Sequence, residues 1–131
     1  MEGFKIEAST GKRDVKTFKD LLIWQQGMRL AEGIYHETER FPKSELYGMV
    51  SQMRRAAVSV PSNIAEGYRR RHAREFQQFL SIALGSLGEL ETQVILAHGF
   101  QYLPLENQNH FLEAIDSLVR MIVGYSKKIC P

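Results

Sequence analysis

The segment that decides the fold is FQQFLSIALGSLGELETQVILA, residues 76–97. Its apolar residues return alternately four and three positions apart, which places their side chains on one face of an α-helix. This face consists of Phe76, Leu80, Ala83, Leu87, Leu90, Val94 and Ala97. We therefore predict a long helix that buries one face and stops at Gly99, after His98.

Upstream of this segment, the same periodicity predicts a first helix over residues 17–40. Thr17 and Asp20 have the spacing of a capping box, and the turn at Phe41-Pro42 closes the helix. Its apolar stripe is expected to comprise Leu21, Trp24, Met28, Ala31 and Tyr35, with Leu30 and Ile34 beside it.

A second helix is expected to begin after Pro42, with Ser44 as its N-cap. Pro61 falls inside this helical pattern, so it either kinks the helix or begins a second, short one, and we favour the kink. The apolar face of this stretch is Leu46, Val50, Met53, Ala57, Val60 and Ile64. After Pro104, a last helix presents Phe111, Ile115, Leu118, Ile122, Tyr125 and Ile129.

Four such helices, joined by short turns and without a strand-like alternation, predict an all-α protein folded as an up-down-up-down four-helix bundle. The length of 131 residues fits a single domain, and we assign the bundle to residues 17–131. Residues 1–16 break the helical pattern and carry mixed charges. We expect them to form an arm outside the bundle, which a partner could order.

The composition places the chain among soluble globular proteins, because 44% of its residues are hydrophobic and 24% are charged. No stretch approaches the roughly 18 uncharged apolar residues of a membrane helix, and no secretion signal precedes the bundle. Cys130 has no partner in the chain, which is typical of a reducing compartment. We therefore expect a cytoplasmic protein without membrane contact.

The predicted third helix has a second face of small residues, formed by Ser81, Gly85, Gly88 and Thr92. A glycine inside a helix is less favourable than alanine by about 1 kcal/mol, so two of them require a reason. They could let another helix of the bundle pack closely, or they could form a subunit contact in a homo-oligomer. A ligand groove is a third interpretation.

The sequence carries no recognisable catalytic motif. It lacks the Glu-x-x-His pairs of di-iron bundles, and the loops that bind nucleotide phosphates are also missing. Histidines followed three residues later by glutamate are typical of solvent-facing helix surfaces. These pairs are His36 with Glu39, His72 with Glu75 and His110 with Glu113. We expect neither an enzyme nor a bound metal or cofactor.

Positive charge concentrates between Arg54 and Arg74, where six arginines accompany one carboxylate, Glu66. This net charge of +5 in a chain of +2 is typical of a phosphate-binding surface, and Tyr68 could add a stacking surface. Alternatively, these arginines could complement a helix dipole or pair with carboxylates of the bundle. The candidate nucleic-acid contacts are Arg54, Arg55, Arg69, Arg70, Arg71 and Arg74.

Three segments together resemble one known family. They are FKDLLIWQQGMRLA (residues 18–31), RRAAVSVPSNIAEGYRRR (54–71) and FLSIALGSLGELET (79–92). In this order they resemble the four-helix-bundle proteins encoded in intervening sequences of bacterial 23S ribosomal RNA genes. The resemblance extends over about residues 17–128.

The resemblance implies a homopentamer of bundles around a central channel, with Gly85 and Gly88 near a subunit or helix contact. It also implies a distant relation to accessory proteins of diversity-generating retroelements, which associate with a reverse transcriptase and nucleic acid. No catalytic residue comes with it. We therefore expect a non-enzymatic, ring-forming protein that binds structured RNA or an RNA-protein assembly. The alternative is a protein-interaction scaffold, such as an accessory subunit of a reverse transcriptase.

Overall fold

The computed structural model describes residues 15–129, so Cys130 and residues 1–14 of the expected arm lie outside the described part. The structure describes only the last two residues of the expected arm, Val15 and Lys16, and both contact the rest of the chain. Val15 packs against the hydrophobic core, and the backbone N–H of Lys16 donates to a carboxylate oxygen of Asp20 at 2.9 Å.

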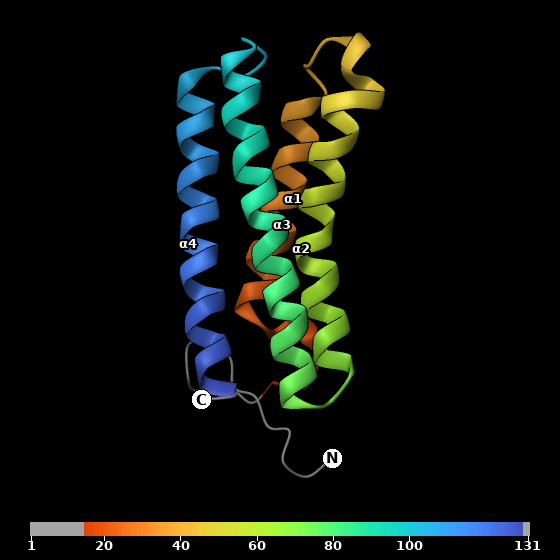
Figure 1. Cartoon of the computed structure of the whole chain (residues 1–131), viewed down its shortest axis with the longest axis vertical. Helices are drawn as coiled ribbons and strands as arrows, with labels where there is room; N and C mark the ends of the chain where they lie inside the picture. The colour runs from red at the N-terminus through yellow and green to blue at the C-terminus, as the bar shows by residue number, and fades with distance from the viewer. Residues whose placement is uncertain (1–14, 130–131) are drawn as a thin grey trace.

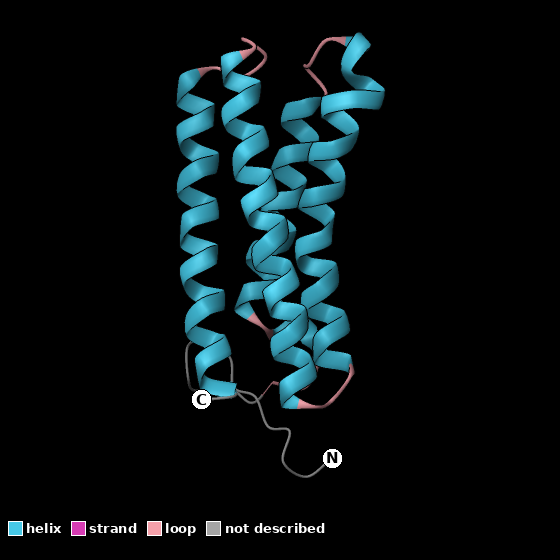
Figure 2. Cartoon of the chain, viewed as in Figure 1, coloured by secondary structure: helices cyan, strands magenta, loops and turns pink. Residues whose placement is uncertain are grey.

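Four long helices form the structure: α1 (Leu22–Thr38), α2 (Ser51–Arg69), α3 (Ala73–Gly99) and α4 (Leu105–Ile129). They run alternately up and down, and no strand occurs among the described residues (Figures 1 and 2). Each helix contacts the next one along the chain, and α4 returns to α1. The predicted all-α four-helix fold is therefore confirmed.

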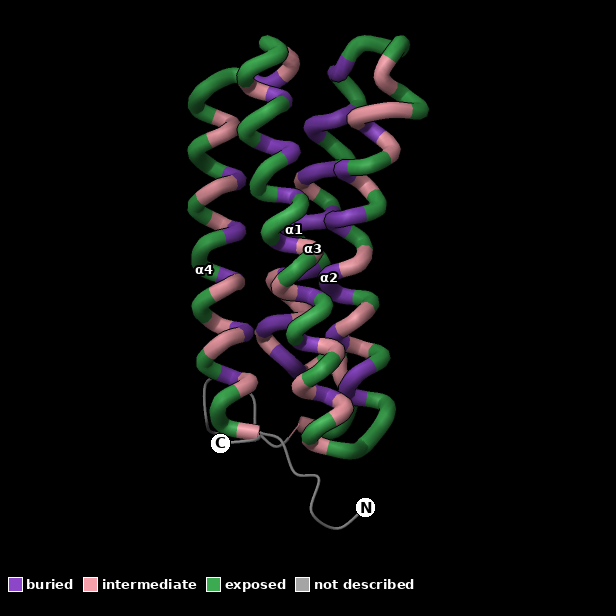
Figure 3. Tube along the Cα trace, in the orientation of Figure 1, coloured by how far each residue is buried: buried purple, intermediate pink, exposed green. Residues whose placement is uncertain are grey.

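The buried residues line the inward sides of the helices (Figure 3). All seven residues predicted for the buried face of α3 are fully buried. The predicted face of α4 is also buried from Phe111 to Tyr125, and only Ile129 at the end is partly exposed. The strict periodicity of these two helices was enough to identify the core.

In α1, the predicted stripe was only partly right. Leu21 and Ala31 are buried, but Met28 and Tyr35 are 37% and 43% exposed, and Trp24 is half-buried. The face that reaches the core instead contains Ile23, Gly27, Leu30 and Ile34. This helix has two adjacent apolar stripes, and only one of them can face the interior.

The first turn contains the predicted capping box of Thr17 and Asp20, but this box caps a short 3-10 helix, η1 (Phe18–Asp20). Leu21 then has an extended backbone, with φ −76° and ψ 125°, so α1 begins at Leu22. Its last helical residue is Thr38, two residues before the predicted end.

The start of the second helical stretch departs from the prediction. Ser44 is not an N-cap; it lies inside a 3-10 turn, η2 (Lys43–Glu45), which is followed by a π-helical turn, η3 (Leu46–Val50). The carboxylate of Glu45 caps that turn by accepting from the Met49 backbone N–H at 3.2 Å. A carboxylate therefore performs the role that we assigned to a hydroxyl.

The interruption of this stretch lies at Gly48, whose φ of −111° and ψ of −106° are not helical. The α2 helix itself continues through Pro61, which is buried and lies against Gly27 of α1. Leu46, which we expected on the apolar face, is 47% exposed because it precedes the interruption.

Candidate nucleic-acid interface

The up-down topology gathers positive charge at one end of the bundle, where α1 and α3 begin and α2 and α4 end (Figure 1). Eight basic side chains lie there with three carboxylates, those of Asp20, Glu66 and Glu75, so this end has a net charge of +5. The other described residues sum to −3. We call this surface the basic end, and its basic residues are Lys16, Lys19, Arg69, Arg70, Arg71, Arg74, Lys127 and Lys128.

Contacts between helices confirm that these residues share one end. The guanidinium of Arg69 lies 5.4 Å from the ring centroid of Phe18, which joins the end of α2 to the turn before α1. The side-chain amide of Gln77 donates to the carbonyl of Ser126 at 3.2 Å, which joins the start of α3 to the end of α4. The segment before α1, the α2–α3 corner and the end of α4 therefore share the basic end.

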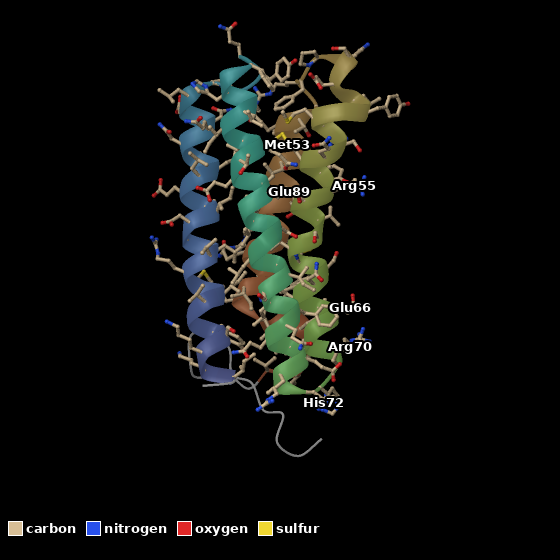
Figure 4. The ribbon with its side chains drawn as sticks, viewed as in Figure 1. Met53, Arg55, Glu66, Arg70, His72 and Glu89 are labelled. Atoms are coloured by element: carbon tan, nitrogen blue, oxygen red, sulfur yellow. The ribbon has the colours of Figure 1, made fainter. Side chains whose placement is uncertain are left out.

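Arg70 is held in place by several neighbours on the surface. Its guanidinium lies over the ring of Phe79 at 5.1 Å and pairs with Glu66 at 3.0 Å and with Glu75 at 3.8 Å. The three charged side chains are each about half exposed. Figure 4 shows Glu66 and Arg70 near the end of α2. Exposed pairs of this kind stabilise a fold by at most about 1 kcal/mol, so they orient Arg70 more than they hold the bundle together.

The turn between α2 and α3 projects Arg71 and His72 into solvent. Arg71 has a φ of 60°, the left-handed region that non-glycine residues seldom occupy. Just before the turn, α2 approaches α3 so closely that a Cβ on Gly67 would lie 2.6 Å from the Cβ of Phe79. The tight approach and the strained turn together fix where the arginines lie.

Arg54 and Arg55, two of the predicted contacts, do not lie at the basic end. Fifteen residues of helix separate Arg54 from Arg69, about 22 Å along the axis. The guanidinium of Arg54 donates to the Thr38 hydroxyl at 2.9 Å and to the Tyr35 carbonyl at 3.2 Å, and it lies 4.5 Å from the Tyr35 ring centroid. Arg54 therefore binds the C-terminal end of α1, whereas Arg55 is exposed.

Polar side chains at the opposite end of the bundle bind one another. Glu37 is 7% exposed and accepts from Arg40 at 3.0 Å and from Asn107 at 2.8 Å. The hydroxyl of Tyr102 donates to Glu45 at 2.8 Å. This hydrogen bond lowers the pKa of the Glu45 carboxyl and raises the pKa of Tyr102.

The small residues on the second face of α3, Ser81, Gly85, Gly88 and Thr92, are all exposed. A Cβ added at Gly85 or Gly88 would meet no atom within 4 Å, so no other described helix of this chain packs closely there. Three large apolar side chains flank this face, because Ile82, Ile95 and Leu96 are 45–51% exposed. We call these seven residues the outer α3 face.

Because α3 carries apolar residues on both its buried and its outer face, its mean hydropathy is high. Its 27 residues contain a window with a mean hydropathy of 1.3, long and apolar enough to cross a membrane by length and composition. A single helix of this kind is weak evidence for a membrane span, because the core helix of a helical bundle has the same properties.

A second apolar surface lies at the outer seam of α1 and α2. Here Trp24, Met28, Tyr35, Val58 and Pro61 line a groove of about 410 Å³. The side chains that we wrongly placed in the core therefore line a surface groove. We call it the α1–α2 groove.

Four lysines of the basic end were not among the predicted contacts: Lys16, Lys19, Lys127 and Lys128. They lie about 110 residues apart in sequence, and only the up-down topology brings them together. That topology was itself predicted, so the signal was present. Among the described residues, no group of three or more histidine, cysteine and acidic side chains could hold a metal ion.

Comparison with known proteins agrees with this fold. A solved structure from the S23 ribosomal protein family of Bacteroides thetaiotaomicron VPI-5482, a protein with unknown function, has a TM-score of 0.73 and 19% identity. The match covers 81% of this chain and 99% of that one, and it supports the fold alone. No curated protein matches the chain. The model of the 23S rRNA-intervening sequence protein family matches residues 19–124, so the chain belongs to that family.

Proposed function

We propose that this protein is a non-enzymatic, oligomeric helical-bundle protein of the cytoplasm that binds structured RNA through its basic end. The observation that carries the proposal is the convergence of eight basic side chains on one end of a chain whose total charge is only +2; they come from the segment before α1, from the α2–α3 corner and from the end of α4. A polyanion gains affinity at such a surface because each neutralised phosphate releases condensed counterions.

The arginines at this end suit an RNA partner in particular. A guanidinium binds two phosphate oxygens at once and can also stack on a base. Arg74, Lys127 and Lys128 have no ion pair among the described residues, so their charge is available to a partner. The family description names an rRNA context, which agrees with an RNA ligand.

We also propose that several copies assemble into a ring, and the resemblance suggests five. Two apolar surfaces support assembly, the outer α3 face and the α1–α2 groove. They lie on different sides of the bundle, so each could contact the other surface on a neighbouring copy. Contacts between unlike surfaces generate closed rings or open filaments rather than simple dimers.

The RNA proposal is tested by titrating a labelled RNA hairpin with the full chain at several salt concentrations, with fluorescence anisotropy as the readout. The test variant combines Arg71→Gln with Arg74→Gln. We expect it to lose at least tenfold in affinity and to lower the salt slope by about 0.9 for each phosphate contact removed. Circular dichroism should show an unchanged helix content, because both side chains are exposed.

A matched control combines Arg29→Gln with Arg120→Gln, which removes the same charge from exposed positions away from the basic end. Its affinity should stay within about twofold of the parent chain, apart from general charge attraction. Equal losses in both variants would overturn the assignment to the basic end. If no RNA binds at low salt, the basic end instead fits an acidic protein, as in the scaffold alternative with a reverse transcriptase.

The assembly proposal is tested separately by light scattering coupled to size exclusion. Gly88→Gln introduces a side chain where nothing lies within 4 Å in the single chain, so the bundle should fold normally. We expect this variant to be monomeric and the parent chain to be oligomeric. A parent chain that remains monomeric at high concentration would refute the ring.

A further inference from the structure

A polar groove lies between α2 and α3, away from the basic end and beside the outer α3 face. It has a volume of about 430 Å³, within the range of small-molecule sites. Its lining is Gln52, Arg55, Ala56, Ser59, Ser86 and Glu89. We call it the α2–α3 groove, and neither the fold nor the proposed RNA contacts explain its chemistry.

A chain of hydrogen bonds joins the two helices at this groove. The hydroxyls of Ser59 and Ser86 lie 2.8 Å apart, across the α2–α3 contact. The side-chain amide of Asn63 donates to the carbonyl of Ser59 at 2.8 Å and to its hydroxyl at 2.9 Å. These contacts fix the spacing of the helices, so the groove is preformed.

Two opposite charges line the groove without binding each other. Arg55 on α2 and Glu89 on α3 are exposed and lie at a similar height on neighbouring helices (Figure 4). Neither makes a hydrogen bond or an ion pair within 4.0 Å in the part of the chain that the structure describes. The adjacent Arg54, by contrast, donates hydrogen bonds to the Thr38 hydroxyl and the Tyr35 carbonyl of α1. A ligand could therefore bind between a guanidinium and a carboxylate that are both available.

A buried acceptor near the groove also lacks a partner. Gln93 is only 6% exposed, and its Oε1 has no hydrogen bond within residues 15–129. Gln93 lies one turn after Glu89 on the same face of α3, and the antiparallel contact of Ser59 with Ser86 places it level with Gln52. Buried acceptors are nearly always satisfied, so this one points to a missing donor.

We propose that the α2–α3 groove binds a guanine base. Guanine presents two adjacent donors, N1–H and the N2 amino group, which match the carboxylate of Glu89. On its other edge, O6 and N7 accept from the guanidinium of Arg55, a frequent pairing of arginine with guanine. Adenine would instead direct the lone pair of N1 at the carboxylate. Gln52 also lines the groove, and Gln93, which is not one of the lining residues, lies one turn beyond Glu89 with a buried acceptor that still needs a donor.

The guanine could belong to a free nucleotide or to an unpaired residue of an RNA. The second source rests on the proposed RNA binding, and the first does not. Arg55 lies 14 residues before Arg69, about 21 Å along α2, so a single strand leaving the basic end can reach the groove.

The test is calorimetric titration of the full chain with GMP, and with AMP, CMP and UMP for comparison. We expect GMP to bind at least tenfold more tightly than AMP. Glu89→Gln and Arg55→Gln should each weaken GMP binding at least tenfold. The matched controls Glu91→Gln and Arg29→Gln, exposed residues that line neither the groove nor the basic end, should leave it unchanged.

Gln93→Met separates a binding role from a packing role. We expect weaker GMP binding without a loss of thermal stability, since the buried acceptor is removed. A short single-stranded RNA with one guanine, compared with the same RNA carrying adenine, identifies the source. Guanine preference in the RNA without GMP binding assigns the groove to RNA, and the reverse result assigns it to a free nucleotide.

Equal affinity for guanine and adenine in both formats would overturn the proposal, as would a Glu89→Gln variant that binds like the parent chain. The failure of the guanine site remains distinct from a failure of RNA binding. If only the guanine site is wrong, the parent chain still binds the RNA hairpin with an affinity that depends on salt and on Arg71 and Arg74. If the RNA proposal is wrong, the parent chain does not bind the hairpin.

Discussion

The two ends of the bundle are built from similar residue types and are held together differently. At the basic end, Tyr68 and Tyr125 each pack edge-on against the buried ring of Phe76, with ring centroids 6.0 and 6.3 Å away. At the opposite end, the charged side chains make hydrogen bonds within the bundle: Glu37 accepts from Asn107, Glu45 accepts from Tyr102, and Arg54 donates to Thr38. Aromatic packing below the surface holds the basic end, where Arg74, Lys127 and Lys128 make no ion pair among the described residues. The same charge types at the other end stabilise the fold.

The strongest test of this comparison removes the aromatic centre of the basic end. Phe76 is fully buried, so Phe76→Ala leaves a cavity and removes the ring against which Tyr68 and Tyr125 both pack. We expect the free energy of unfolding to fall by about 3–5 kcal/mol. Urea denaturation measures it, and a loss below about 1 kcal/mol would show that the rings do not hold this end.

A smaller loss is expected at the opposite end for Arg54→Met. The change removes two charge-assisted hydrogen bonds to the end of α1, although Thr38 keeps its bond to the Ile34 carbonyl at 2.7 Å. We expect a loss of about 2 kcal/mol in the free energy of unfolding. The adjacent Arg55→Met is the control, and it should stay within about 0.5 kcal/mol because Arg55 is exposed. Equal losses would remove the distinction between these two arginines.

A pH-dependent effect is expected from Glu45 and Tyr102. The hydrogen bond lowers the pKa of Glu45, so its stabilisation is present above the ordinary glutamate pKa and is lost as the pH falls through the lowered value. The raised pKa of Tyr102 gives the opposite limb, with stability lost at strongly alkaline pH.

The comparison between parent and Tyr102→Phe isolates this hydrogen bond. Thermal unfolding between pH 3 and pH 7 should show a flatter acid limb in the variant, because the donor that lowers the Glu45 pKa is absent. Identical acid limbs would indicate that other carboxylates account for the acid sensitivity.

The smallest effect on stability is expected at the basic end itself. Arg74→Gln should change the free energy of unfolding by less than about 0.5 kcal/mol, since the side chain is exposed and has no ion pair among the described residues. The measurement is the same urea titration as for Arg54. A loss as large as that of Arg54→Met would mean that the basic end also depends on its charges for folding.

The fold was predictable where one apolar stripe was unambiguous. In α3 and α4 the four-and-three spacing picks out one stripe, so the core followed from spacing alone although Ile82, Ile95 and Leu96 of α3 lie outside that stripe. In α1, spacing did not distinguish the Trp24 stripe from the Ile23 stripe, because both are apolar and the choice depends on the neighbouring helices. The cap at Glu45 was missed because a π-helical turn has no common sequence signature.

The site was predictable only in part, since local charge density identifies residues but not their contacts. Arg69 to Arg74 were found as a cluster, and the structure keeps them together. Arg54 belongs to the same run in sequence, yet it faces the end of α1, which no spacing argument reveals. The groove between α2 and α3 was not predicted, because it forms only where Ser86 and Glu89 of α3 lie beside the polar side chains of α2.

The left-handed backbone of Arg71 lowers the stability of the turn between α2 and α3. Glycine would occupy a φ of 60° without strain, whereas arginine in this region is less stable by about 1 kcal/mol. Selection for thermal stability alone would be expected to favour glycine at position 71. If Arg71 contacts RNA as proposed, the arginine at the tip of the turn is retained at the expense of stability.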